Sequence, residues 1–263
     1  MKQAEQLHLY PMPDVMAFST TRHGGCGSGT YGTFNCTPYT GDEASVVLAN
    51  QEVLCKLVGI HAEQLIVPYQ THSSNVLIID ESFMQLSSDA RHAMLQEKDS
   101  VVTNIPGLCL CVSTADCVPV LLYDSAQKVI AAVHAGWRGT VGKIVKNTLQ
   151  VMCKNYGTKT EDVYAVIGPC ISLDAFEVGI EVYETFEQAG CDMKQIANWH
   201  PEKEKYHIDL PKANCLQLLA EGVPQAQIHD SGICTYTQHR DFFSARRLGI
   251  QSGRILNGIV LKD

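Results

Sequence analysis

Short runs of β-branched and other apolar residues recur along the chain, bordered by polar residues, glycine or proline. Runs of this kind are typical of β-strands. We therefore expect a strand-rich protein in which several strands follow one another directly between residues 64 and 134. The predicted strands cover residues 14–20, 64–69, 75–80, 99–104, 108–114, 118–124, 128–134 and 162–168.

Apolar residues at spacings of three and four predict helices in two further segments. The first is 43–58, where Asp42 suits the N-cap position, and the second is 139–153. A third helix is expected over 211–221, because Pro211 suits a first turn. Since strands come in a run and helices follow, the pattern favours a mixed α/β (α+β) fold over strict βαβ alternation.

The whole chain, residues 1–263, is predicted to form one domain. It contains no low-complexity segment, internal repeat or linker rich in proline and serine. The longest apolar runs, 118–123 and 129–133, are far shorter than the roughly 20 residues of a membrane-spanning helix. The N-terminal segment also lacks the basic-then-apolar order of a secretory signal. We therefore expect a soluble, cytoplasmic protein.

The chain is acidic, with a net charge of −8 from 20 basic and 28 acidic residues. This balance argues against nonspecific binding to nucleic acid or to an anionic membrane, both of which need a basic surface. A small anionic ligand is still compatible with it, because a few arginines can make a local site. The oligomeric state is not predicted.

The 11 cysteines do not suggest a disulfide framework, because their number is odd and no secretory signal is present. No C-x-x-C pair occurs, so zinc ribbons and thioredoxin chemistry have no support. Cys55, Cys109, Cys111 and Cys153 lie in apolar segments and are predicted to behave as small hydrophobic residues.

Three residues with metal-binding side chains lie where predicted strands end: His72, Cys117 and His134. Two imidazoles and a thiolate are able to form an open zinc site whose fourth position holds water or substrate. Asp116 is a candidate catalytic or supporting carboxylate beside such a site. The alternative is a satisfied core histidine and an inert buried thiol, and the spacing alone does not decide between them.

Two segments are candidates for anion binding. Arg22 precedes Gly24 and Gly25 in a glycine-rich stretch whose amides suit an anion, although a tight turn explains the glycines equally well. Near the C-terminus, Arg246 and Arg247, with Arg254 close by, form a basic patch. Paired arginines are often only solvated or salt-bridged, so the alternatives stay open here as well.

Taken together, several ordered segments resemble the YfiH/laccase-domain family, whose members are purine nucleoside phosphorylase-like proteins formerly described as multicopper polyphenol oxidases. The matching segments include STTRHGG…YGTFN, Gln70-Thr71-His72, STADCVPVLL, AAVHAGWRGT, IGPCIS…FEVGIEV, YHIDL and CTYT…FFSARR. Two departures stand out: Ala245 replaces a usual aromatic residue, which bears on the pocket wall, and Cys36 replaces a usual leucine.

The resemblance implies a single domain of layered mixed β-sheets flanked by helices. It implies a metal, usually zinc with copper as the alternative, held by His72, Cys117 and His134. It further implies phosphorolysis of adenosine, inosine, guanosine and methylthioadenosine with inorganic phosphate, and deamination of adenosine. The substrate- or phosphate-binding candidates in the matching segments are Arg22, Gly24, Gly25, Asn35, Gln70, Arg138, Arg246 and Arg247.

Other classes of function remain open from the sequence. A laccase-like copper oxidase depends on clustered H-x-H steps, and none occurs among the 10 histidines. A metal-free cysteine hydrolase would use Cys117 as nucleophile with a histidine as base. A pure binding module would hold nucleosides without releasing product.

Overall fold

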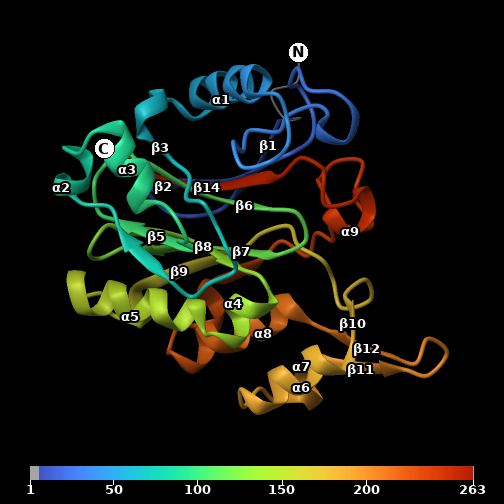
Figure 1. Ribbon diagram of the computed structural model, residues 1–263. Helices are drawn as coiled ribbons and strands as arrows, with labels where there is room; N and C mark the ends of the chain where they lie inside the picture. Colours follow the sequence, from blue (N-terminus) through green and yellow to red (C-terminus); the bar gives the residue numbers. More distant parts are fainter. Residues whose placement is uncertain (1–5, 263) are drawn as a thin grey trace.

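The computed structural model describes residues 6–262 as four stacked layers (Figure 1). A five-stranded and a six-stranded sheet pack face to face, helix α1 covers the outer face of the first, and helices α5 and α8 cover that of the second. The main helices are α1 (Ala44–Val58), α4 (Trp137–Val141), α5 (Ile144–Tyr156), α6 (Ile180–Gln188) and α8 (Leu210–Ala220). Short helices are α2 (Glu81–Met84), α3 (Ser88–Met94), α7 (Met193–Ile196) and α9 (Ala245–Leu248).

The five-stranded sheet has the order β1-β2-β14-β6-β3. Its strands are β1 (Leu7–Tyr10), β2 (Val15–Thr20), β3 (Leu65–Ile66), β6 (Cys109–Thr114) and β14 (Ile255–Leu261). Strand β14 lies at the centre and pairs antiparallel with both β2 and β6, whereas β3 runs parallel to β6. The first and the last described strands of the chain, β1 and β14, therefore belong to the same sheet, with β2 between them.

The six-stranded sheet has the order β13-β9-β7-β8-β5-β4. Its strands are β4 (Val76–Ile78), β5 (Ser100–Thr103), β7 (Val118–Asp124), β8 (Val129–Ala135), β9 (Val163–Ile167) and β13 (Ile228–Asp230). The central pair β7 and β8 is buried along its whole length. Burial on both faces explains why these two strands are almost continuously apolar in sequence.

Alternation of side chains divides each central strand between two cores. In β8, Ala131 and Val133 face the helices, while Ile130 and Ala132 face the other sheet. His134 continues the set that faces the other sheet, because side chains alternate with a period of two. The strand therefore places the His134 side chain on the face toward the five-stranded sheet, near the end of both sheets.

A small three-stranded sheet, in the order β10-β12-β11, lies at the edge of the molecule next to helices α6 and α7 (Figure 1). Its strands are β10 (Glu177–Val178), β11 (Ala197–His200) and β12 (Lys205–Ile208). This region adds to the helical side of the core through residues such as Val178 and Ile208.

The predicted mixed α/β class and layered sheets are confirmed, and all eight predicted strands are present, one with the predicted bounds (118–124) and seven with shifted bounds. Three details were wrong. The strand predicted over 64–69 pairs only at Leu65–Ile66, and the helix predicted over 139–153 is two helices, because Lys143 adopts a left-handed φ of 59° between α4 and α5. The N-cap of α1 is Glu43; Asp42 instead accepts the Glu43 N–H at 2.9 Å.

Of the four cysteines predicted to behave as small hydrophobic residues, Cys55, Cys109 and Cys111 are buried, whereas Cys153 is only half-buried. All 11 cysteines are free thiols. Among residues 6–262, no helix has both the length and the apolar character that crossing a membrane would need.

Candidate metal centre

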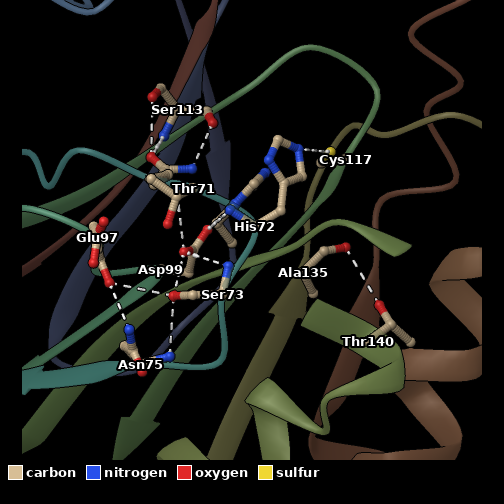
Figure 2. A network of polar contacts seen from close by, with 12 residues as sticks. Thr71, His72, Ser73, Asn75, Glu97, Asp99, Ser113, Cys117, Ala135 and Thr140 are labelled. Atoms are coloured by element: carbon tan, nitrogen blue, oxygen red, sulfur yellow. Dashed lines mark hydrogen bonds and ion pairs between the residues drawn. The ribbon is translucent and has the colours of Figure 1, made fainter. Parts of the chain in front are cut away.

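His72, Cys117 and His134 come together at one end of the two large sheets. One ligand atom from each lies within 4.8 Å of the other two, and no other such group of three occurs in the described part of the chain. The Cys117 Sγ lies 3.6 Å from His72 Nε2, a contact drawn as a dashed line in Figure 2. The imidazole centroids of His72 and His134 are 4.8 Å apart. The predicted convergence of these three residues is confirmed.

Two of these residues lie in segments that connect one sheet to the other. His72 is in the connection from β3 to β4, and Cys117 directly precedes β7 after the chain leaves β6. Each connection passes from the five-stranded to the six-stranded sheet. The group of three therefore forms where the sheets are joined.

Asp99, which directly precedes β5, organises the segment that carries His72. Its side chain is fully buried and lies at the centre of the hydrogen-bond network in Figure 2. The carboxylate accepts hydrogen bonds from the backbone N–H of Thr71 (3.2 Å), His72 (3.0 Å) and Ser73 (2.8 Å), and from the Ser73 hydroxyl (2.7 Å). Burial raises the pKa of Asp99, but the contacts with His134 and Ser73 outweigh it and lower the pKa to about 2.

The same carboxylate also fixes the ring of His134. Asp99 Oδ1 lies 2.7 Å from His134 Nδ1, so Nδ1 donates its proton to Asp99. Nε2 is then the free atom of the ring, directed toward Cys117. This carboxylate–histidine arrangement is the one that orients metal-binding imidazoles in proteins.

Cys117 and His134 strongly affect each other's protonation. Burial raises the pKa of Cys117, but His134 and His72 outweigh it, and the pKa falls to about 6. Burial lowers the pKa of His134, yet Cys117 and Asp99 raise it to about 9. A thiolate is therefore favoured at neutral pH, which is the form of cysteine that binds metals.

The backbone is strained on both sides of the centre. His72 has a φ of 61° and Asp116 a φ of 97°, values that side chains other than glycine rarely adopt. Asp116 is held there because its carboxylate accepts the Thr235 hydroxyl (2.7 Å) and the Arg246 N–H (2.7 Å). Asp116 thus lies beside Cys117 without belonging to the group of three ligands.

Gly136 has no side chain, and this provides the space that His72 and Cys117 occupy. A Cβ at this position would lie 2.7 Å from His72 Cδ2 and 3.0 Å from Cys117 Sγ. Its φ of −64° is ordinary, so glycine is needed here for space and not for conformation.

The donor set fits zinc. Tetrahedral zinc, with bonds of about 2.3 Å to sulfur and about 2.0–2.1 Å to nitrogen, places these two donors about 3.6 Å apart. The separation of Cys117 Sγ and His72 Nε2 is 3.6 Å. Three protein ligands also leave the fourth position that catalytic zinc sites keep open.

The three ligands open into a pocket of about 330 Å³. Its walls include Tyr39 and Tyr69, whose rings meet edge to face at 5.1 Å, and Ile250, which is 80% exposed at the rim. Ala245 also lines the pocket, so the departure from the usual aromatic residue lies in the pocket wall. Gln70 lines it as well, with both ends of its amide bonded to Ser113.

The other predicted site residues lie outside this pocket. Arg22 donates to the carbonyl oxygens of Gly32 (2.9 and 3.0 Å) and His239 (2.6 Å). Arg138 is exposed, with its guanidinium carbon 4.2 Å from the centroid of the Trp137 ring. Their predicted roles toward phosphate stay predictions.

Arg246 and Arg247 are also exposed. Arg246 donates to the Glu177 carbonyl at 3.2 and 3.3 Å, and Arg247 donates to the Tyr236 hydroxyl at 3.3 Å. Within residues 6–262, neither lines the pocket that holds the three ligands. Their roles likewise remain predicted.

The glycine-rich stretch forms a turn fixed by its neighbours. Gly24 has a φ of 80° and its carbonyl accepts a hydrogen bond from Gln6, while the Gly25 N–H donates to Thr33 Oγ1 at 3.3 Å. Asn35 is fully buried and accepts the backbone N–H of Arg254 at 3.1 Å. Asn35 therefore helps to position Arg254, which lines the pocket, without lining the pocket itself.

Two residues of the site, Asp99 and Gly136, were not predicted, and Arg254 was predicted only as part of the basic patch. Asp99 is the first residue of a predicted strand. A charged residue at the start of an apolar run was the only sequence feature that could have indicated a role for it. Gly136 lies in the HAGWRG segment, whose glycine has no local pattern to mark it. Arg254 belongs to the basic patch, but its sequence neighbours do not distinguish it from Arg246 or Arg247.

Comparison with known proteins identifies the family. The family model described as multi-copper polyphenol oxidoreductase laccase matches residues 16–262. The chain belongs to this family. The predicted family is therefore confirmed.

Two members of the family are close in sequence. The purine nucleoside phosphorylase of Bacteroides thetaiotaomicron is 54% identical over 248 residues, which cover 94% of this chain and 92% of that protein. Adenosine deaminase RL5, from an unknown prokaryotic organism, is 44% identical over 94% of each. The crystal structure of the hypothetical protein YfiH from Bacillus licheniformis has a TM-score of 0.91 and 26% identity, covering 99% of this chain and 98% of that one.

Proposed function

We propose that this protein is a metal-dependent purine nucleoside phosphorylase that also deaminates adenosine. The observation that carries the proposal is the open centre of His72, Cys117 and His134 at the base of a pocket. The similarity to a purine nucleoside phosphorylase and to an adenosine deaminase supports the reaction class. The proposed substrates are adenosine, inosine, guanosine and methylthioadenosine, with inorganic phosphate as co-substrate.

Zinc is the proposed metal, with copper as the alternative. When bound, such a metal supplies Lewis-acid polarisation and lowers the pKa of a bound water toward neutrality. The protein's own part is to present one thiolate and two imidazoles in a fixed arrangement. Asp99 does this by holding the backbone at His72 and the ring of His134 at once.

The pocket supplies the environment for a nucleoside. The edge-to-face pair of Tyr39 and Tyr69 offers an aromatic wall for a planar base. Gln70 and Ser113 hold each other, so the wall between the aromatic pair and the ligands is rigid. A rigid polar site of this kind stabilises developing charge without reorganising during the reaction.

Product analysis with adenosine tests the proposal. Purified, zinc-loaded protein should convert adenosine to adenine and ribose 1-phosphate when phosphate is present, and to inosine when it is absent. Cys117→Ala should abolish both reactions, whereas Cys153→Ala, which alters a half-buried thiol on α5, should keep both. Unchanged product formation by Cys117→Ala would contradict the assignment.

The same preparation separates this function from an oxidase. Oxygen uptake with a phenol, measured on protein loaded with either zinc or copper, should stay at the level of the Cys117→Ala variant. Phenol oxidation that exceeds nucleoside turnover would favour the oxidase instead.

A further inference from the structure

Arg254 is the one arginine or lysine among the described residues that line the metal pocket. The four arginines predicted to bind phosphate are directed elsewhere, onto carbonyl oxygens, a hydroxyl group or an aromatic ring. A doubly charged co-substrate that enters this pocket therefore meets a single cationic side chain.

The guanidinium of Arg254 is held along one side only. Nη1 donates to the carbonyl oxygens of Ser252 (2.7 Å) and Gly253 (3.0 Å), and Nη2 donates to that of Ile250 (3.0 Å). Among residues 6–262, Nε has no acceptor and no carboxylate lies within 4.0 Å of the group. The bonded side fixes the plane of the guanidinium and leaves its remaining donors free.

The charge of Arg254 lies close to the metal centre. Burial lowers the pKa of Arg254, and Cys117 and Asp116 act in the opposite direction through their negative charges. A half-buried cation without an ion-pair partner is costly, so an anion beside it is favoured. The planar fork of arginine matches the oxygens of phosphate.

We propose that Arg254 is the phosphate-binding residue of this protein, an inference that rests on the proposed phosphorolysis. An oxygen of hydrogen phosphate forms a bond to C1′ of the nucleoside while the bond from C1′ to the purine nitrogen breaks. The electron pair of that bond stays on the purine, which takes up the proton that hydrogen phosphate carried. Arg254 holds the phosphate during this exchange and does not donate a proton itself.

Deamination provides an internal control, because it consumes water and no phosphate. Arg254→Gln should raise the KM for phosphate by about 10- to 100-fold, the range expected on losing hydrogen bonds to a charged group. Formation of inosine in the absence of phosphate should stay within about twofold of wild type, which also shows that the variant is folded. Arg240→Gln, which alters an exposed arginine outside the pocket, should change neither value.

Arg254→Lys tests whether the positive charge of this side chain is sufficient for phosphate binding or whether the planar guanidinium is needed as well. It keeps the cation but loses the planar fork, so the KM for phosphate should fall between those of wild type and Arg254→Gln. If Arg22→Gln or Arg246→Gln raised the KM for phosphate and Arg254→Gln did not, the inference would be overturned.

A binding measurement distinguishes failure of this inference from failure of the proposed function. Inorganic phosphate should raise the Tm of zinc-loaded wild-type protein and leave that of Arg254→Gln unchanged. If wild type turns over no nucleoside, the proposed function fails, but this difference in Tm still supports Arg254 as an oxyanion site. Equal shifts in the two proteins would refute the role of Arg254.

Discussion

A single buried carboxylate orients two candidate metal ligands, His72 and His134, that are far apart in sequence. Asp99 accepts hydrogen bonds from the backbone around His72 and from the ring of His134. Its full burial and its lowered pKa both follow from the number of donors directed at it. The geometry of the centre therefore depends on a residue that is not itself a ligand.

Asp99→Asn should weaken zinc binding by about 10- to 100-fold, as losses of such supporting contacts do. An amide presents one acceptor oxygen and two N–H groups, so it cannot serve all the donors that surround Asp99. Competition with a chromophoric chelator measures the Kd for zinc. Asp241→Asn alters an exposed carboxylate paired with His23 and is the matched control. Equal affinities in Asp99→Asn and wild type would contradict this account.

Gly136→Ala should impair zinc binding and both nucleoside reactions while the fold persists. The added methyl group meets His72 and Cys117 Sγ, and the backbone conformation suits alanine. Gly59→Ala is the opposite case: its Cβ has free space, but its φ is 76°. That control should lower the free energy of unfolding by about 1 kcal/mol and leave zinc binding intact. Together, the two variants distinguish the effect of a steric clash with the candidate ligands from the effect of an unfavourable backbone conformation.

At the residue scale, the sequence predicts the three ligands but not their support. His72, Cys117 and His134 lie where predicted strands end, and the resemblance to a family identifies them as candidate metal ligands, which their spacing alone does not. A lone carboxylate or glycine carries no such signal, because its role depends on which segments the fold brings near it. The same limit explains why Arg254 was not separated from its neighbours.

At the scale of elements, the pattern did not predict β1, β10, β11, β12, β13 or β14, and β14 is the most central of these strands. It occupies the centre of the five-stranded sheet, yet its sequence includes Asn257 and Gly258 between apolar residues. Gly258 is needed because a side chain there would meet Phe18 and Cys111, both fully buried under α1. A glycine in a central strand is thus a mark of close packing.

Gly258→Ala should destabilise the protein by about 1–3 kcal/mol, the usual cost of overpacking a filled core. Urea denaturation measures this as a lower midpoint with an unchanged slope. The double variant with Phe18→Leu should recover part of the loss, since the leucine removes ring atoms from the contact. Additive effects of the two changes would show that the contact is not the cause.

Helix α4 shows another limit of pattern at this scale. Apolar positions continue across residues 139–153, and the break at Lys143 leaves the periodicity almost unchanged. A change in backbone direction at one residue does not alter which positions are apolar. The spacing of apolar residues therefore predicted the buried face of these helices correctly, but it wrongly predicted a single continuous helix.

At the scale of the whole molecule, the centre connects the two large sheets. His72 and Cys117 lie in the segments that pass between the sheets, and His134 ends a central strand of one of them. The layered arrangement was expected only through the resemblance to a family, because strand order depends on contacts between distant segments. A metal bound by these three residues would tie those segments together.

Zinc should therefore raise the Tm of the chelator-treated protein. A ligand at about 100 times its Kd stabilises a native state by about 2.7 kcal/mol. For a chain of this size that corresponds to roughly 5 to 10 °C. Scanning calorimetry with and without zinc measures the shift, and Cys117→Ala should show little of it. An identical Tm in the two wild-type samples would contradict the prediction.

The central position of β14 has a consequence for synthesis on the ribosome. Strands β2 and β6 both pair with residues 255–261, which are translated after every other described element. The five-stranded sheet cannot close while that segment is still inside the exit tunnel, so the nascent chain must wait with two open strand edges. Arg254, directly before β14, reaches the pocket at the same late moment. During translation, the five-stranded sheet therefore forms only after residues 255–261 have been synthesised and have left the tunnel, with strands β2 and β6 unpaired on those edges until then.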